Sequence, residues 1–155
     1  MYDLQNIEAI KRLKYKYMRC LDQKLWDEMA ECFVEDATSA YSGGKYSFEG
    51  RDAILAFFRE SMGSPKVLSS HRVHQPEIEI TSDTTATGHW ALEDVYINEE
   101  MGVTVRGAAY YRDEYVKVGD SWKIQHTGYQ RAYEEMESRN DMPWLKITQR
   151  AGDPA

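Results

Sequence analysis

Two cysteines, no basic run and no long apolar segment set the first limits on this chain of 155 residues. Cys20 and Cys32, both in segments with helical patterns, form neither a disulfide framework nor a zinc spacing, so we interpret them as buried thiols in a reducing compartment. The net charge of −7, without a basic stripe, argues against nucleic acid or an anionic membrane as partner. No stretch could span a bilayer, and the N-terminus does not resemble a signal sequence, so we expect a cytoplasmic protein.

Tyrosine and tryptophan, in contrast, are abundant, with eleven and four copies. Their side chains combine an apolar body with a polar tip, which suits the wall of a half-polar cavity. An aromatic-rich core explains the same composition, so the counts alone leave both interpretations open.

Helical patterns come first along the chain and strand patterns follow, which predicts an α+β domain. Apolar residues at steps of three or four indicate helices, and extended runs between turn residues indicate strands. The expected elements are helices at about 7–21, 24–33 and 51–62, a hairpin pairing 38–41 with 46–49, and strands at about 67–74, 77–81, 85–97, 103–118 and 122–133.

Three of these strands are long, and long strands in a small domain must twist and curl. A curled antiparallel sheet with the N-terminal helices on its concave side leaves a hollow between the two. We expect a single domain over 1–155, whose polar end from Glu134, and above all 138–155, forms a tail. This tail would be partly mobile or pack on a neighbouring subunit.

Alternation along the strands identifies two ionisable side chains that point inward. Asp94 shares its face with small and aromatic residues, including Trp90, so it is either a hydrogen-bonded core carboxylate or a functional one. His71 shares its face with two valines, whereas His74 points outward. A single inward histidine is a core residue or a catalyst, and no second histidine or cysteine stands at metal-ligand spacing to make it a metal site.

Three further residues have both a structural and a functional interpretation. Asp22, at the junction of the first two helices, could cap the second helix or orient a histidine. Tyr17 could be a core aromatic or a phenol that donates a hydrogen bond into a pocket. Arg131 could close the mouth of the pocket or pair with a surface acid.

Several runs of this sequence resemble the SnoaL-like family of the nuclear-transport-factor-2-like superfamily. They are 7–14, 17–22, 26–28, 76–80, 85–88 and 128–135, and the resemblance extends over about residues 5–137. Within the family the sequence is most similar to bacterial bile-acid 7α-dehydratases, and more distantly to scytalone dehydratases. The resemblance implies a cone-shaped, barrel-like α+β fold.

The resemblance also implies a set of catalytic residues, which match Tyr17, Asp22, His71 and Asp94. His71 would be the general base and Asp22 its orienter, while Tyr17 and Asp94 assist the oxyanion or the departing hydroxyl group. Neither a cofactor nor a metal is implied, because these side chains supply every proton transfer. The residues expected to contact the substrate are Arg131, Tyr41, Trp90 and Tyr129.

The function expected from this resemblance is a dehydratase-type lyase acting on a hydrophobic polycyclic, steroid-like or aromatic carbonyl compound. An isomerase of the ketosteroid type, or a polyketide-cyclase-like enzyme, would use the same base without a leaving group. A non-catalytic binding domain is the third alternative, and it would not need an oriented base. We also expect a homo-oligomer, either a trimer or a dimer.

Overall fold

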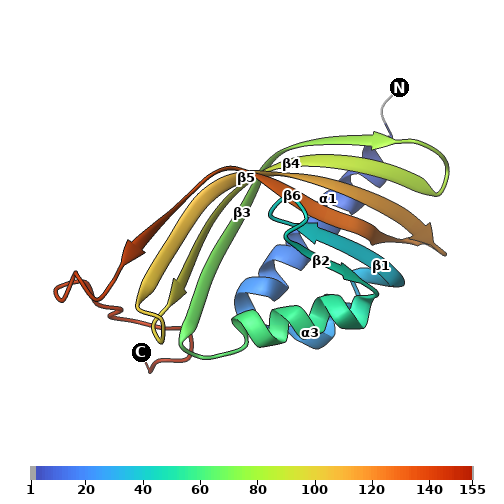
Figure 1. Ribbon diagram of the computed structural model, residues 1–155. Coiled ribbons are helices and arrows are strands. Elements are labelled where there is room, and N and C mark those ends of the chain that lie inside the picture. The colour runs from blue at the N-terminus through green and yellow to red at the C-terminus, as the bar shows by residue number, and fades with distance from the viewer. Residues whose placement is uncertain (1–2, 155) are drawn as a thin grey trace.

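The computed structural model describes residues 3–154, so Met1, Tyr2 and Ala155 lie outside the described residues. Its elements, in chain order, are α1 (Leu4–Gln23), α2 (Trp26–Ala30), β1 (Phe33–Tyr41), β2 (Tyr46–Glu49), α3 (Arg51–Met62), β3 (Val67–Ile80), β4 (Thr85–Asn98), β5 (Val103–Val118) and β6 (Ser121–Ser138). A curved sheet bends over α1 and α3, which lie on its concave side (Figure 1). This arrangement confirms the predicted α+β class. Between residues 3 and 154 the structure contains no helix with the length and apolarity needed to cross a membrane.

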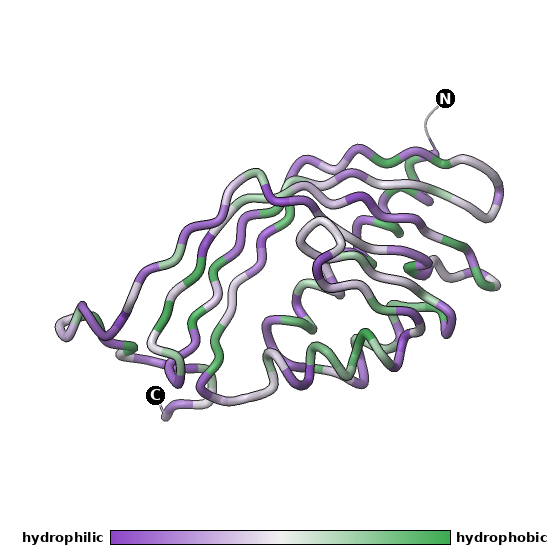
Figure 2. Tube along the Cα trace, viewed as in Figure 1, coloured by the Kyte–Doolittle hydropathy of each residue, from purple (hydrophilic) through white to green (hydrophobic). Residues whose placement is uncertain are grey.

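The sheet has six strands in the order β2-β1-β6-β5-β4-β3 and stays open between its two edge strands. Apolar and polar residues alternate along the strands, which gives the sheet one face against the helices and one face outward (Figure 2). Every neighbouring pair is antiparallel except β1 and β6, which run parallel. The sheet is therefore mixed, whereas the sequence predicted antiparallel pairing throughout.

The first helix is anchored at its start and strongly buried along one face. The carboxylate of Asp3 accepts a hydrogen bond of 3.1 Å from the backbone N–H of Asn6, which caps the helix. Ile10, Tyr17 and Leu21 are buried on the inward stripe, as the periodicity predicts. This stripe places the C-terminal turn of α1 beside β3, where the candidate site lies.

The second helix is much shorter than predicted, and β1 begins where the helix was expected to continue. Cys32 lies in the turn between them, and its carbonyl accepts a hydrogen bond of 2.8 Å from the N–H of Ile124. Phe33 then pairs with Ile124 in the parallel register of β1 and β6. A short apolar run is compatible with helix or strand, and pairing with a distant strand decides between the two.

The two strands expected at 67–74 and 77–81 form one strand, β3, with an irregularity between His74 and Glu77. Gln75 has a φ of 45° there, the left-handed region that non-glycine residues rarely adopt. The extra residue reverses the alternation. His71 therefore points inward before the bulge, and Ile78 packs against the core after it.

The last strand continues to Ser138, so the segment 134–138 belongs to the sheet and not to the tail. The residues after it contact their own chain. Arg139 donates a hydrogen bond of 2.8 Å to the Thr104 hydroxyl, and Arg150 forms an ion pair of 2.6 Å with Glu99. Packing on a neighbouring subunit stays a prediction.

Candidate active site

A cavity of about 470 Å³ lies between the concave face of the sheet, the last turns of α1, and α3. Most of its wall is aromatic, and ionisable groups face it from β3, β4 and β6. The aromatic residues are Tyr17, Tyr41, Tyr46, Phe57, Phe58, Tyr96, Tyr111 and Tyr129. Such a wall suits an apolar ring system, and the few polar groups would fix its orientation.

His71 and Asp22 meet at one side of this cavity. His71 Nδ1 lies 2.7 Å from Asp22 Oδ1, and the backbone N–H of His71 donates a hydrogen bond of 2.8 Å to Oδ2. An ionised carboxylate can only accept, so Nδ1 carries the proton and Nε2 is left as a free base. The two side chains are only 11% and 16% exposed, which limits competition from water.

The carboxylate of Asp22 is held by donors from β3. Ser69 donates a hydrogen bond of 2.9 Å to Oδ1, and Arg72 Nη1 lies 3.6 Å from Oδ2. Burial opposes ionisation of Asp22, but the hydrogen bonds from His71 and Ser69 outweigh it and hold the pKa of Asp22 below its ordinary value. Asp22 does not cap the second helix, because α1 runs through it and the N-cap of α2 is Leu25.

A second ion pair, Asp94–Arg131, crosses the cavity wall beside His71. Asp94 lies directly opposite His71 in the pairing of β4 with β3, so both side chains face the cavity. Arg131 donates two hydrogen bonds, of 2.5 and 2.9 Å, to the carboxylate of Asp94, and its Nε lies 3.1 Å from Glu134. Burial disfavours the charge of Arg131, but Asp94 raises the pKa of the guanidinium and keeps it protonated. Arg131 thus pairs with a buried acid of the cavity, Asp94, and also with the exposed acid Glu134.

Two phenols form the polar end of the aromatic wall. The hydroxyl oxygens of Tyr17 and Tyr41 lie 3.0 Å apart, and both side chains are buried. Burial raises the pKa of each phenol above its ordinary value, so both stay protonated. One of the two protons lies in the hydrogen bond between the hydroxyls, and both can be donated once a ligand oxygen replaces that bond. Tyr129 stacks obliquely on Tyr41 and accepts a hydrogen bond of 3.2 Å from Ser42.

Comparison with known proteins identifies the family of this chain. The model of the SnoaL-like domain matches residues 3–128, which is most of the chain. The chain belongs to the SnoaL-like domain family. Among solved structures, it is similar to a candidate scytalone dehydratase from Novosphingobium aromaticivorans, with 25% identity over 86% of this chain and 88% of that chain and a TM-score of 0.79.

Two more distant structures share the fold of this SnoaL-like domain. A type 2 hexachlorocyclohexane dehydrochlorinase, LinA, is 18% identical over 86% of this chain and 90% of that chain, with a TM-score of 0.77. A nuclear-transport-factor-2-like protein of unknown function from Pseudomonas putida is 15% identical over 84% and 89%, with a TM-score of 0.70. These likenesses confirm the predicted cone-like superfamily fold. The predicted closeness to bile-acid 7α-dehydratases stays a prediction.

Asp22 reaches the cavity only through His71, and Trp90 is the other predicted site residue that does not line the cavity of this SnoaL-like domain. Its side chain is 1% exposed, and its indole N–H donates a hydrogen bond of 2.9 Å to the hydroxyl of Tyr115. Alternation identifies the face of the strand on which a side chain lies, but not whether that part of the strand borders the cavity. Trp90 lies four residues, roughly 13 Å, from Asp94 along the strand. Trp90 is therefore a core residue beyond the closed end of the cavity.

Sequence reasoning also missed residues that the structure brings to the site. Tyr111 shares the inward face of β5 and lines the cavity, so alternation along 103–118 would have identified it. Ser69 shares the face of His71, but its bond to Asp22 depends on how α1 docks on β3. The periodicity of 51–62 predicts a helix but not which of its residues form the cavity wall, and Phe57 and Phe58 do so.

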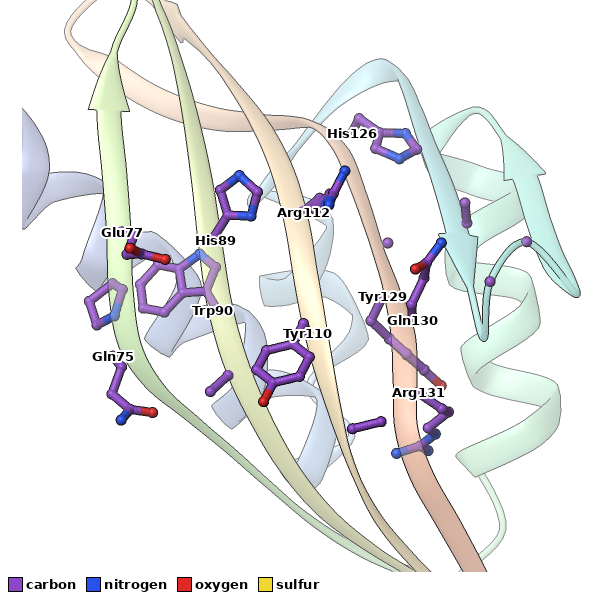
Figure 3. Close-up of a pocket in the computed structure, with 17 residues that line it drawn as sticks. Gln75, Glu77, His89, Trp90, Tyr110, Arg112, His126, Tyr129, Gln130 and Arg131 are labelled. Atoms are coloured by element: carbon purple, nitrogen blue, oxygen red, sulfur yellow. The ribbon is translucent and has the colours of Figure 1, made fainter.

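The part of the chain described, residues 3–154, contains no cluster of three metal-ligating side chains. A larger hollow of about 1100 Å³ lies on the outer face of the sheet, away from the helices (Figure 3). His89, Tyr110 and Arg112 point into it, but it lacks the Asp22–His71 pair. We place the candidate active site in the smaller cavity, because the oriented base and the phenols converge there.

Proposed function

We propose that this SnoaL-like protein is a cofactor-independent lyase that removes a hydroxyl group from a neutral polycyclic or aromatic carbonyl compound. One observation carries the proposal. His71 is oriented by Asp22 through Nδ1, and this leaves Nε2 as a base in a cavity with a largely aromatic wall. A domain that only bound a ligand would not need an oriented base.

The proposed reaction starts with the transfer of a proton from the carbon beside the carbonyl group to His71 Nε2. Tyr17 and Tyr41 donate hydrogen bonds to the carbonyl oxygen, where negative charge develops. The C–H electron pair then forms the carbon–carbon double bond, and the C–O bond to the hydroxyl group breaks. The imidazolium of His71 returns the proton to the departing hydroxide, so that water leaves and the base is restored.

The Asp94–Arg131 pair has a different role in this proposal. Asp94 lies beside His71 on the neighbouring strand, where it can accept a hydrogen bond from the hydroxyl group that leaves. Because Arg131 is already paired with Asp94 and Glu134, it offers little free positive charge for a substrate carboxylate. The cations that line the cavity, Arg131 and Lys45, are matched by the carboxylates of Asp94 and Glu134, and this balance favours an uncharged substrate.

The size of the cavity supports the same class of substrate. Pockets that enclose most of a small molecule typically measure about 300–1,000 Å³, and the cavity falls in the lower half of that range. A ring system of three or four fused rings fits such a volume, and eight aromatic side chains are available to stack on it.

An isomerase or a cyclase would use the same base, so only the products distinguish these two classes of enzyme from a lyase. We would incubate the protein with a panel of polycyclic β-hydroxy ketones and record the ultraviolet band of the conjugated enone. Elimination yields a product lighter by one water, whereas isomerisation leaves the mass unchanged. Exchange of the proton beside the carbonyl group into deuterated water reports the base even when no group leaves.

The first prediction is that His71→Ala lowers the rates of turnover and of deuterium exchange by at least about 100-fold, the usual contribution of a general base. The matched control is His74→Ala, on the same strand but exposed on the outward face, which keeps the wild-type rate. Circular dichroism checks that both variants fold. Full activity of folded His71→Ala would refute the proposed mechanism.

A further inference from the structure

A fully buried ion pair lies behind the candidate active site, between α1 and β5. Lys14 Nζ is 2.7 Å from Asp113 Oδ2, and neither side chain has any exposed surface. Burying two charges is costly, and such a pair often stabilises a protein no more than well-packed apolar residues would. Stability therefore does not explain why Lys14 and Asp113 are present.

The surroundings of Asp113 hold the pair in one place. Thr127 donates a hydrogen bond of 2.7 Å to Oδ1, and Tyr115 donates one of 2.7 Å to Oδ2. Trp90 in turn donates to the hydroxyl of Tyr115. With these bonds the carboxylate has one orientation, and so has the ammonium group that it binds.

The other side of the ammonium group faces two aromatic rings. Lys14 Nζ lies 3.4 Å from the ring centroid of Tyr111 and 4.8 Å from that of Tyr17. Both distances are within the range of a cation–π contact, which is strongest where water is excluded. Tyr111 and Tyr17 also line the cavity, so one buried cation lies against two of its phenols.

We propose that Lys14 is a positioning residue of the candidate active site, whose ammonium group fixes and polarises the phenol rings of Tyr111 and Tyr17. A cation at the face of a phenol draws electron density from the ring and makes its O–H a stronger hydrogen-bond donor. Asp113 keeps the cation in place through the 2.7 Å ion pair. The use of these phenols to bind a negative oxygen rests on the proposed function, but the polarisation itself does not.

The test replaces Tyr111, Tyr17 or Tyr46, one at a time, by a polyfluorinated tyrosine whose phenol ionises well below the usual tyrosine range. The phenol then titrates while Lys14 is still charged, although burial lowers the pKa of Lys14 against the effect of Asp113. The other ionisable groups that face the two phenols are Asp113, Tyr41 and Tyr129. ¹⁹F NMR gives the phenol pKa in the wild-type background and in Lys14→Met/Asp113→Asn, which removes both charges together.

We expect the double variant to raise the phenol pKa at position 111 by about one unit, since the ammonium group lies against the face of that ring, 3.4 Å from its centroid. The increase is smaller at position 17, where the ring lies farther from Nζ. It is absent at position 46, on the rim of the cavity. Thr127→Val is the matched control, because it removes the hydrogen bonds of Thr127 with Asp113 and with Lys14 Nζ but keeps both charges, and it changes the three values far less than the double variant does.

Equal phenol pKa values at position 111 in the wild type and the double variant would overturn the proposal and make the pair purely structural. An equal rise at all three positions would overturn it too, since that would show a general change in the cavity. If the double variant does not fold, Lys14→Gln/Asp113→Asn keeps a hydrogen-bonding pair and gives the same comparison. No substrate is used, so a failed lyase assay and a failed titration are separate results.

Discussion

Asp22 occupies a position that is unfavourable for a carboxylate on local grounds. It lies in the last turn of α1, where the negative end of the helix dipole disfavours further negative charge. The donors on β3 compensate, since His71 and Ser69 together supply three hydrogen bonds. The placement of Asp22 is best explained by its contact with His71.

The second prediction is that Asp22→Asn lowers activity on the substrate by about 100-fold or more, because the amide no longer holds the proton of His71 on Nδ1. Thermal unfolding should shift by only a few degrees, since the amide fills the same space and keeps part of the hydrogen bonding. A large loss of stability with an unchanged rate would contradict this role.

The lowered pKa of Asp22 also makes the stability of the fold depend on pH. The pKa of Asp22 is lower in the folded state than in the unfolded state, so the ionised carboxylate adds stability above the unfolded value of about 4. This contribution is lost as the pH falls through the folded-state pKa. Urea titrations between pH 6 and 3 should therefore show a steeper loss for the wild type than for Asp22→Asn.

At the scale of the elements, Lys24 joins the end of α1 to the beginning of β3. It has a left-handed φ of 58°, where glycine would be the usual residue. Its ammonium group donates hydrogen bonds to the backbone carbonyls of Met62, Ser64 at 2.9 Å and Val67 at 2.7 Å. These hydrogen bonds of Lys24 set how α1 docks on β3, and this docking brings Asp22 into contact with His71.

The third prediction compares two substitutions of Lys24. Lys24→Met loses the charged hydrogen bonds and keeps the strained backbone, so it should destabilise the fold by about 2 kcal/mol. Lys24→Gly loses the same bonds but removes the strain of the left-handed backbone. The Gly variant should therefore be more stable than the Met variant by about 1 kcal/mol. Urea unfolding measures both, and a Gly variant less stable than the Met variant would contradict the account.

The bulge in β3 shows why the element boundaries could be predicted only in part. Hydrophobic alternation located the inward face of the first half of β3, and His71 was identified correctly as an inward residue. The alternation changes phase at Gln75, and from the sequence alone this change indicates a break between two strands. The continuous pairing of both halves with β4 makes them one strand, and such pairing is a long-range contact.

At the scale of the molecule, the outer face of the sheet remains without a covering layer. Tyr110 stands on this face and is 63% exposed, beside the small side chains of Ala91 and Ala132. Glu77 and Arg112 lie on either side of His89 in the strand register, so the face carries charges of both signs. A face with these properties can pair with a second copy of itself, which is the basis for expecting a homo-oligomer.

The fourth prediction is that Tyr110→Glu shifts the protein from an oligomer to a monomer, because a charge would be buried in the interface. Light scattering coupled to size-exclusion chromatography measures the mass. Leu4→Glu, also at an exposed apolar residue but at the start of α1, is the control and leaves the mass unchanged. A monomeric wild-type protein would contradict the expectation directly.

What the sequence by itself determined is the class of most elements and the inward face of two strands. These depend on periodicity, which is local, so α1, α3, β4 and β5 and the inward orientation of His71 and Asp94 followed without coordinates. The tertiary structure alone decided the parallel pairing of β1 with β6, the core position of Trp90 and the burial of Lys14 with Asp113. Each of these results from contacts between residues far apart in the chain, whose free energies exist only once the sheet has curved over the helices.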